Sequence, residues 1–288
     1  MENDAKFALI SHKINLYFGS IILFAGIFGS ILNLIVFSRL RQTSSSLYLL
    51  IISVLNIGQL LTGLLTRVMI SGFDLDWTNH SLFYCKFRQF FNQFCSSTSF
   101  SLICLATIDQ YFITCSNRHW HRYSNMKIAR FSTIFFICFW ILHGVPYLIY
   151  NEHTTILNSN RFFCVTANEA LRNYFFFFYN TFLASLLPVA INSIFAVLVH
   201  QNLQQNAEKN LFIIRRTFEK QLTTIILVQD LFSFCFLMPH IFGNLFTFHS
   251  VMINDLSSIP KLIVRHSVTL MIYHLHFAVS QFHRLTFN

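Results

Sequence analysis

The chain has 288 residues, of which 54% are hydrophobic and only 11% are charged, and its formal net charge is +9 at pH 7. A soluble domain carries about 25% charged residues, so these charges are too few to cover a water-exposed globule. The 36 phenylalanines would form adhesive patches on such a surface. The positive charge does not indicate nucleic acid, because the basic residues lie in short clusters between apolar runs and no aromatic-basic binding module is present.

The long apolar runs predict the fold. A spanning helix needs about 20 mostly apolar residues, and runs without Asp, Glu, Lys or Arg extend over residues 14–38, 42–66, 89–108, 131–151, 173–207 and 231–254. A seventh run, 266–283, is shorter and contains four histidines. Because backbone in hydrocarbon must satisfy its own hydrogen bonds, we expect an all-α, seven-transmembrane helix bundle in a lipid bilayer. The expected helices are 14–38, 46–70, 82–115, 127–150, 173–200, 218–247 and 262–285.

The two ends of the chain, residues 1–13 and 286–288, lie outside the predicted bundle, which covers 14–285. Residues 1–13 lack the pattern of a cleavable signal, so we expect a short extracellular amino terminus, and a carboxy-terminal stub without an eighth helix or tail. Lys and Arg are divided almost evenly between the two sides, so the positive-inside rule barely decides the orientation. Asn79-His80-Ser81 is a glycosylation acceptor after the second run, and such acceptors are used only on the lumenal side. It favours an external amino terminus in a multi-pass protein of the plasma membrane.

The seven cysteines fall into two groups. Cys115 sits near the inner end of the third run, and four others lie within apolar runs, where we expect small buried hydrophobes: Cys95, Cys104, Cys138 and Cys235. Cys85 and Cys164 instead lie in segments placed outside, where the environment is oxidising. We expect these two to form a disulfide.

This arrangement of cysteines is accompanied by further motifs. Trp77 precedes Cys85 in the first predicted outer loop, and Asp109-Gln110-Tyr111 begins 24 residues after Cys85. Other single residues occur in order, each in its own run: Asn33 of Gly29-Ser30-Ile31-Leu32-Asn33, Trp140, Pro188 and Pro239. Together they resemble the motifs of the rhodopsin-like (class A) G protein-coupled receptors. In that family the corresponding features are an outer disulfide, a tryptophan in the first outer loop, an Asp-Arg-Tyr triplet, and single conserved residues in helices one, four, five and six.

The sequence also departs from the pattern of that family. Gln110 replaces the arginine that contacts the G protein, Asn56 stands where helix two has an aspartate for sodium, and Leu237 stands where helix six has a tryptophan. The seventh run has no Asn-Pro-x-x-Tyr signature, and residues 280–284 occupy that region. The resemblance therefore predicts the fold more strongly than it predicts coupling.

The resemblance implies an outward-facing ligand pocket between helices two, three, five, six and seven. The polar residues that its register places there are Arg67, Gln89, Asn92, Gln93, Asn180, His240 and Asn244. None is acidic, and Asn92 falls where amine receptors of this family have an aspartate. A peptide or another small non-amine ligand, acidic or neutral, is the expected partner. The alternative is that these amides only bond one another across helices.

The resemblance also implies a switch that acts on a heterotrimeric G protein. Its residues would be Asp109, Gln110, Tyr111 and Pro239. Proline removes a backbone donor and loosens a helix, so Pro239 could act as a hinge for helix six, and a static kink is the alternative.

Other function classes have less support. Neither a zinc-binding histidine pair nor a glycine-rich phosphate loop is present, so we expect no enzyme, cofactor or metal site. A transporter or channel would use Asp230 as a pathway group, but it would predict internal repeats, which are absent. A receptor fold that does not couple, a decoy or truncated homologue, is motivated by Gln110 and by the missing signature of helix seven.

Overall fold

In the computed structural model the described residues are 2–39, 43–73, 75–117, 119–155, 162–208, 215–252 and 259–285. They form seven long helical spans, three of which contain a π-helical segment. In chain order the spans are α1 (Glu2–Lys13), η1 (Ile14–Phe18) and α2 (Gly19–Arg39); α3 (Ser44–Gln59), η2 (Leu60–Leu65) and α4 (Thr66–Phe73); α6 (Leu82–Thr114); α7 (Met126–Tyr150); α8 (Glu169–Asn173), η4 (Tyr174–Leu186) and α9 (Leu187–Glu208); α10 (Arg215–Met252); and α11 (Ile259–Leu285).

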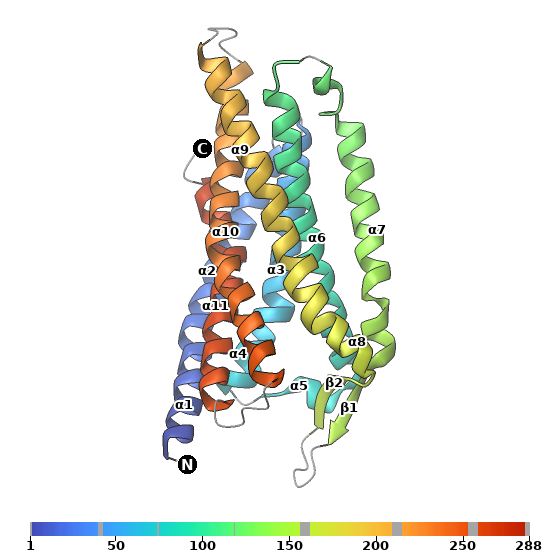
Figure 1. The fold of residues 1–288 in the computed structure, drawn as a ribbon, viewed down its shortest axis with the longest axis vertical. Coiled ribbons are helices and arrows are strands. Elements are labelled where there is room, and N and C mark those ends of the chain that lie inside the picture. Colours follow the sequence, from blue (N-terminus) through green and yellow to red (C-terminus); the bar gives the residue numbers. More distant parts are fainter. Residues whose placement is uncertain are drawn as a thin grey trace.

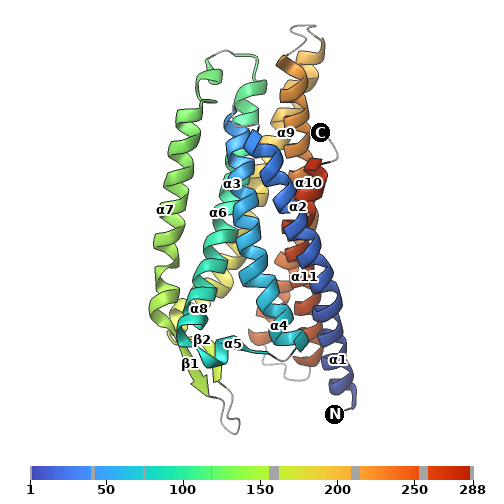
Figure 2. The ribbon, with the colours of Figure 1, turned by 180° about the vertical axis from the view of Figure 1, so that it is seen from behind.

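Four short elements connect these spans. They are α5 (Trp77–His80), the 3-10 turn η3 (Trp120–Arg122), β1 (Asn151–Thr155) and β2 (Phe162–Thr166). The two strands pair antiparallel, with His153 opposite Cys164. Figures 1 and 2 place this hairpin, α5, α8 and the amino terminus at one end of the bundle. We call it the hairpin end, and the end with the α6–α7 connection the opposite end.

The outer surface of the bundle is strongly apolar. Five described spans are long and apolar enough to cross a bilayer: Leu9–Arg39, Ser44–Phe73, Met126–Tyr150, Glu169–Gln205 and Thr223–Phe246. Phe24 and Phe131 are both 75% exposed and Leu142 is 70% exposed. Such side chains gain nothing from facing water, so this surface is suited to lipid tails.

α6 occupies the centre of the bundle and is more polar than those five spans. It packs against α3, α7, α9 and α10, and a continuous run of its small polar residues is buried, Ser96, Ser97, Thr98 and Ser99. Apolar residues of the neighbouring helices surround this region, including Leu60, Leu64 and Phe277, each fully buried. The polar face of α6 is thus inside, where other helices supply hydrogen-bond partners.

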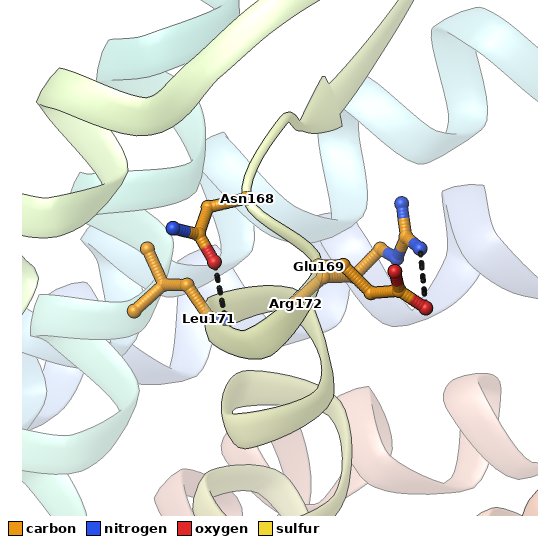
Figure 3. A network of polar contacts seen from close by, with 4 residues as sticks. All are labelled: Asn168, Glu169, Leu171 and Arg172. Atoms are coloured by element: carbon orange, nitrogen blue, oxygen red, sulfur yellow. Dashed lines mark hydrogen bonds and ion pairs between the residues drawn. The ribbon is translucent and has the colours of Figure 1, made fainter.

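Side-chain caps define where several helices begin. Asn168 Oδ1 accepts a hydrogen bond from the backbone N–H of Leu171 at 3.0 Å and so starts α8 (Figure 3). Thr43, Ser81 and Asn125 cap α3, α6 and α7 in the same way. Each such cap contributes about 1 kcal/mol to helix stability. The Glu169–Arg172 ion pair beside the α8 cap is 4.0 Å long and well exposed, so it adds little.

Candidate functional site

A cavity of about 320 Å³ opens among the helices toward the hairpin end. Its lining residues come from α6, α7, η4, α10 and α11: Gln89, Asn92, Gln93, Ser96, Tyr147, Tyr179, Asn180, Ala184, Ser185, His240, Asn244, His266, Leu270 and Tyr273. Its volume is at the lower end of the range of small-molecule sites, which runs from about 300 to 1,000 Å³. The described residues of the lining supply amides, hydroxyls and imidazoles, and none of them is Asp, Glu, Lys or Arg.

The helical period explains why α6 lines this cavity with polar residues. Gln89, Asn92, Gln93 and Ser96 follow one another at steps of three, one and three residues, so they share one face of the helix. This face of α6 points toward the space between η4 and α11, because residues of those two elements line the same cavity.

Hydrogen bonds and ring contacts hold one wall of the cavity in place. Gln93 Nε2 lies 3.0 Å from His143 Nδ1, and His143 Nε2 lies 3.0 Å from the hydroxyl of Tyr174. Tyr179 bonds with the hydroxyl of Ser97. These contacts join α6, α7 and η4, and His143 positions the amide of Gln93.

A hydrogen bond and a ring contact lie in the wall formed by α10 and α11. His240 Nε2 lies 3.2 Å from Asn244 Nδ2, and the rings of His240 and Tyr273 are 4.7 Å apart. His240 follows Pro239 directly in α10, and Asn244 lies one helical turn after His240. A molecule in the cavity would therefore contact α10 next to its proline.

Six of the seven residues expected to face a ligand line the cavity, and Arg67 does not. The Nε of Arg67 donates to Asn15 Oδ1 at 3.0 Å, and Nη2 donates to Ser267 Oγ at 3.3 Å. Arg67 therefore ties α4 to η1 and α11 instead of entering the cavity. Its partners lie 52 and 200 residues away in the chain, so no local sequence signal could have predicted them.

Several lining residues were not expected from the sequence. Ser96 continues the stripe of Gln89, Asn92 and Gln93, so the helical period could have identified it. Tyr147, Tyr179 and Tyr273 could not have been identified in this way, because aromatic residues make up 17% of the chain and occur in every span.

A disulfide joins the start of α6 to the hairpin. Cys85 and Cys164 are bonded, with their Cα atoms 5.8 Å apart, as the sequence predicted. Trp77 of α5 makes an edge contact with Tyr84 of α6, with ring centroids 6.2 Å apart. The side chain of Asn79, in the same short helix, lies outside the described residues.

A second polar site lies at the opposite end of α6. Asp109 is 5% exposed and accepts hydrogen bonds from the hydroxyls of Ser44 and Ser45 at 2.6 and 2.5 Å. Gln110 is 1% exposed and uses both ends of its amide: Nε2 donates to Ser45 at 2.7 Å, and Oε1 accepts from Thr223 at 2.6 Å. The carboxyl group of Asp109 and the amide of Gln110 thus connect α6 to α3, and the same amide connects α6 to α10.

The amino-acid sequence can be compared with known protein families. Residues 29–279 match the model of the 7 transmembrane receptor (rhodopsin family). The chain belongs to this family. A comparison with curated proteins finds no match. The protein is therefore a multi-pass membrane protein with the all-α, seven-transmembrane fold of these receptors, a family of receptors rather than of enzymes.

The motif residues of this receptor make specific contacts between helices. Asn56 Oδ1 accepts from Ser99 at 2.8 Å, and Trp140 Nε1 donates to Ser101 at 2.8 Å. Pro188 is buried at the start of α9, and its carbonyl lies 3.8 Å from Cys104 Sγ. Asn33 of α2 is fully buried, and the ring of Tyr111 packs edge-on against Phe195 of α9 at 5.6 Å. Asn56, Trp140 and Pro188 thus connect α3, α7 and α9 to α6, and Tyr111 of α6 packs on α9.

The disulfide gives a first prediction. Replacing Cys164 with Ser should lower the free energy of unfolding by about 2–4 kcal/mol, because the bond closes a long loop of the unfolded chain. The measurement is thermal unfolding of the receptor in lipid nanodiscs. Cys138→Ser is the matched control, because Cys138 is a free and exposed cysteine of α7, and an equal loss in both variants would contradict the prediction.

Proposed function

We propose that this protein is a plasma-membrane receptor that binds a peptide or another non-amine ligand in the cavity and signals to a heterotrimeric G protein. The observation that carries the proposal is the cavity itself, whose described lining residues offer many uncharged hydrogen-bonding groups and include no acidic side chain. The proposal places the ligand in contact with Gln89, Asn92, Gln93, Asn180, His240 and Asn244.

The chemistry of the lining argues against an amine ligand. A buried ammonium group without an opposite charge costs several kcal/mol, and Asn92 provides an amide where a carboxylate would be needed. Amide and hydroxyl groups can instead pair with the backbone of a peptide or with a neutral polar molecule. Because Arg67 is bonded to Asn15 and Ser267 outside the lining, a neutral group fits the cavity better than an acidic one.

The proposed orientation has the hairpin end outside the cell. The Cys85–Cys164 bond lies at that end, and disulfides persist in oxidising surroundings. The acceptor sequence at Asn79 lies beside it in the chain, so glycosylation at this residue is part of the proposal. The cavity then opens toward the extracellular side and the Gln110 site faces the cytoplasm.

The proposed switch is the restraint of α10 by Gln110. Thr223 is the contact through which α10 is hydrogen-bonded to this residue, while Pro239, His240 and Asn244 lie farther along the same helix, at the cavity. A ligand that binds His240 or Asn244 more favourably when α10 has moved would shift the receptor toward that state. Asp109, Gln110 and Tyr111 would then lie at the surface that the G protein reads.

A receptor fold that does not couple is the second candidate. The observation that favours it is Gln110, because a neutral amide cannot replace the charge of an arginine. Both amide ends of Gln110 are engaged inside the bundle. A signalling assay separates the two candidates.

The ligand proposal predicts which variants lose sensitivity. Cells that express the receptor would be tested with a library of peptides and neutral small molecules, with G protein activation as the readout. For an active compound, Asn244→Ala should raise the half-maximal concentration about tenfold, because one buried hydrogen bond is lost. Ile194→Ala is the control, since Ile194 is 60% exposed on α9. Activation by amines alone would sink the ligand proposal.

The switch proposal predicts constitutive signalling. Thr223→Val removes the hydrogen bond to Gln110, and a net loss of about 1 kcal/mol should raise basal G protein activation about fivefold. Ser233→Ala is the control, because its hydroxyl donates to the carbonyl of Gln229 in the same helix. Unchanged basal activity at equal surface expression would show that Thr223 does not restrain α10, and silence of every variant with every compound would favour the non-coupling candidate.

A further inference from the structure

Asp230 is a buried acid that the proposed function does not use. It lies on α10 and is only 5% exposed. Its carboxyl oxygens accept from the hydroxyl of Thr107 at 3.0 and 3.3 Å. The same hydroxyl lies 3.0 Å from the carbonyl of Ile103, and a hydroxyl has a single proton. The carboxyl group therefore shares one donor with a backbone carbonyl.

No cation neutralises this carboxyl group within the described part of the chain. Its interactions there are the contact with Thr107 and a weaker electrostatic one with Cys104. Buried acids are normally paired with a cation or with several donors, because desolvation of the charged form costs free energy. An ionisable residue at membrane depth is for this reason a candidate functional group.

Asp230 borders a second cavity, which we call the lateral groove. It has a volume of about 510 Å³ and lies between α9 and α10. Its lining is Ser193, Ala196, Val197 and His200 of α9 and Leu227, Asp230, Leu231 and Phe234 of α10. None of these residues lines the ligand cavity. The groove is thus a separate site with an acid at one point of a mostly apolar lining.

The residues around the groove place it on the lipid-facing side of the bundle. Val197 is 57% exposed, Leu231 is 62% exposed and Phe234 is 44% exposed. In a seven-transmembrane protein such residues contact acyl chains, so the groove can be entered from the bilayer without passing through water. His200, which is exposed, bonds with Gln204 on its own helix and forms no ion pair with Asp230.

We propose that the lateral groove binds a single-chain lipophilic primary amine, with its ammonium group on Asp230 and its alkyl chain between α9 and α10. An ammonium group supplies three donors and a positive charge, which are what the carboxyl group lacks. An alcohol supplies one donor without charge, and a fatty acid brings a second negative charge. The volume of the groove suits one alkyl chain better than the two chains of a phospholipid.

The position of the groove indicates what its occupancy would do. Asp230 lies on α10 between Thr223, which contacts Gln110, and Pro239. An amine that bridges Asp230 and the apolar face of α9 would hold these two helices together. This effect is separate from the ligand cavity, and the binding test does not depend on signalling.

The test uses the full-length receptor in phosphatidylcholine nanodiscs and three probes with the same chain, octadecylamine, octadecanol and octadecanoate. The thermal unfolding midpoint is measured against probe concentration. Octadecylamine should reach half of its effect at a concentration at least about tenfold lower than octadecanol, because a buried charge pair forms only with the amine. Octadecanoate should give no shift.

Two variants locate the effect. Asp230→Asn keeps the shape of the side chain and removes its charge, so the amine should lose its tenfold advantage over the alcohol. Asp109→Asn is the matched control, because Asp109 also carries a buried carboxyl group and lies outside the groove. Leu231→Trp fills the groove and should abolish the shifts of the amine and the alcohol.

The outcomes separate the proposal from simpler explanations. An advantage of the amine that is lost in Asp230→Asn and kept in Asp109→Asn supports it. Equal shifts with all three probes mean that the groove accepts any alkyl chain, and this result overturns the proposal. An amine advantage that persists in Asp230→Asn, one that is lost equally in Asp109→Asn, or the absence of any shift overturns it as well.

Discussion

The structure depends on one constraint, which is that polar side chains cannot be hydrated where the bundle faces hydrocarbon. The buried polar residues of α6 therefore lie in the centre of the bundle, where their hydroxyls and amides bond to other helices. Ser99 pairs with Asn56 of α3, and Ser101 pairs with Trp140 of α7. Phenylalanines such as Phe24 and Phe131 face outward. Helix packing, the polar cavity and the Gln110 contacts are three consequences of the same distribution.

Much of the fold follows from local sequence, because long apolar runs have only one stable backbone conformation in lipid. The start of the first span does not follow in this way. Hydropathy places its start at residue 14, whereas the helix begins at Glu2, and Ser11 in the added turns bonds with Ser267 of α11 at 2.7 Å. Such contacts connect residues far apart in the chain, so they have no local signature. The hydrogen bonds of Arg67 to Asn15 and Ser267 could not be predicted for the same reason.

The two ends of the bundle differ in how they are held. At the hairpin end a covalent bond fixes β2 on α6, and the cavity beside it is lined by groups with capacity for further hydrogen bonds. At the opposite end hydroxyls, the carboxyl group of Asp109 and the amide of Gln110 hold α3, α6 and α10 together. Family register could assign Asp109 and Gln110 to that end, but it could not predict Thr223, because the partner of a glutamine is set by packing. α10 connects the two ends, with Asp230 and the lateral groove between them.

The central claim is that the cavity opens to water outside the cell, while the outer face of the same bundle is in lipid. Two variants, each with a cysteine in place of Asn244 or Ile194, test this claim directly. A membrane-impermeant thiol reagent is applied to intact cells that express each variant. The account predicts labelling of Asn244→Cys, which lines the cavity, and none of Ile194→Cys, which is 60% exposed on the outer face of α9. Labelling of Ile194→Cys with protection of Asn244→Cys would contradict it.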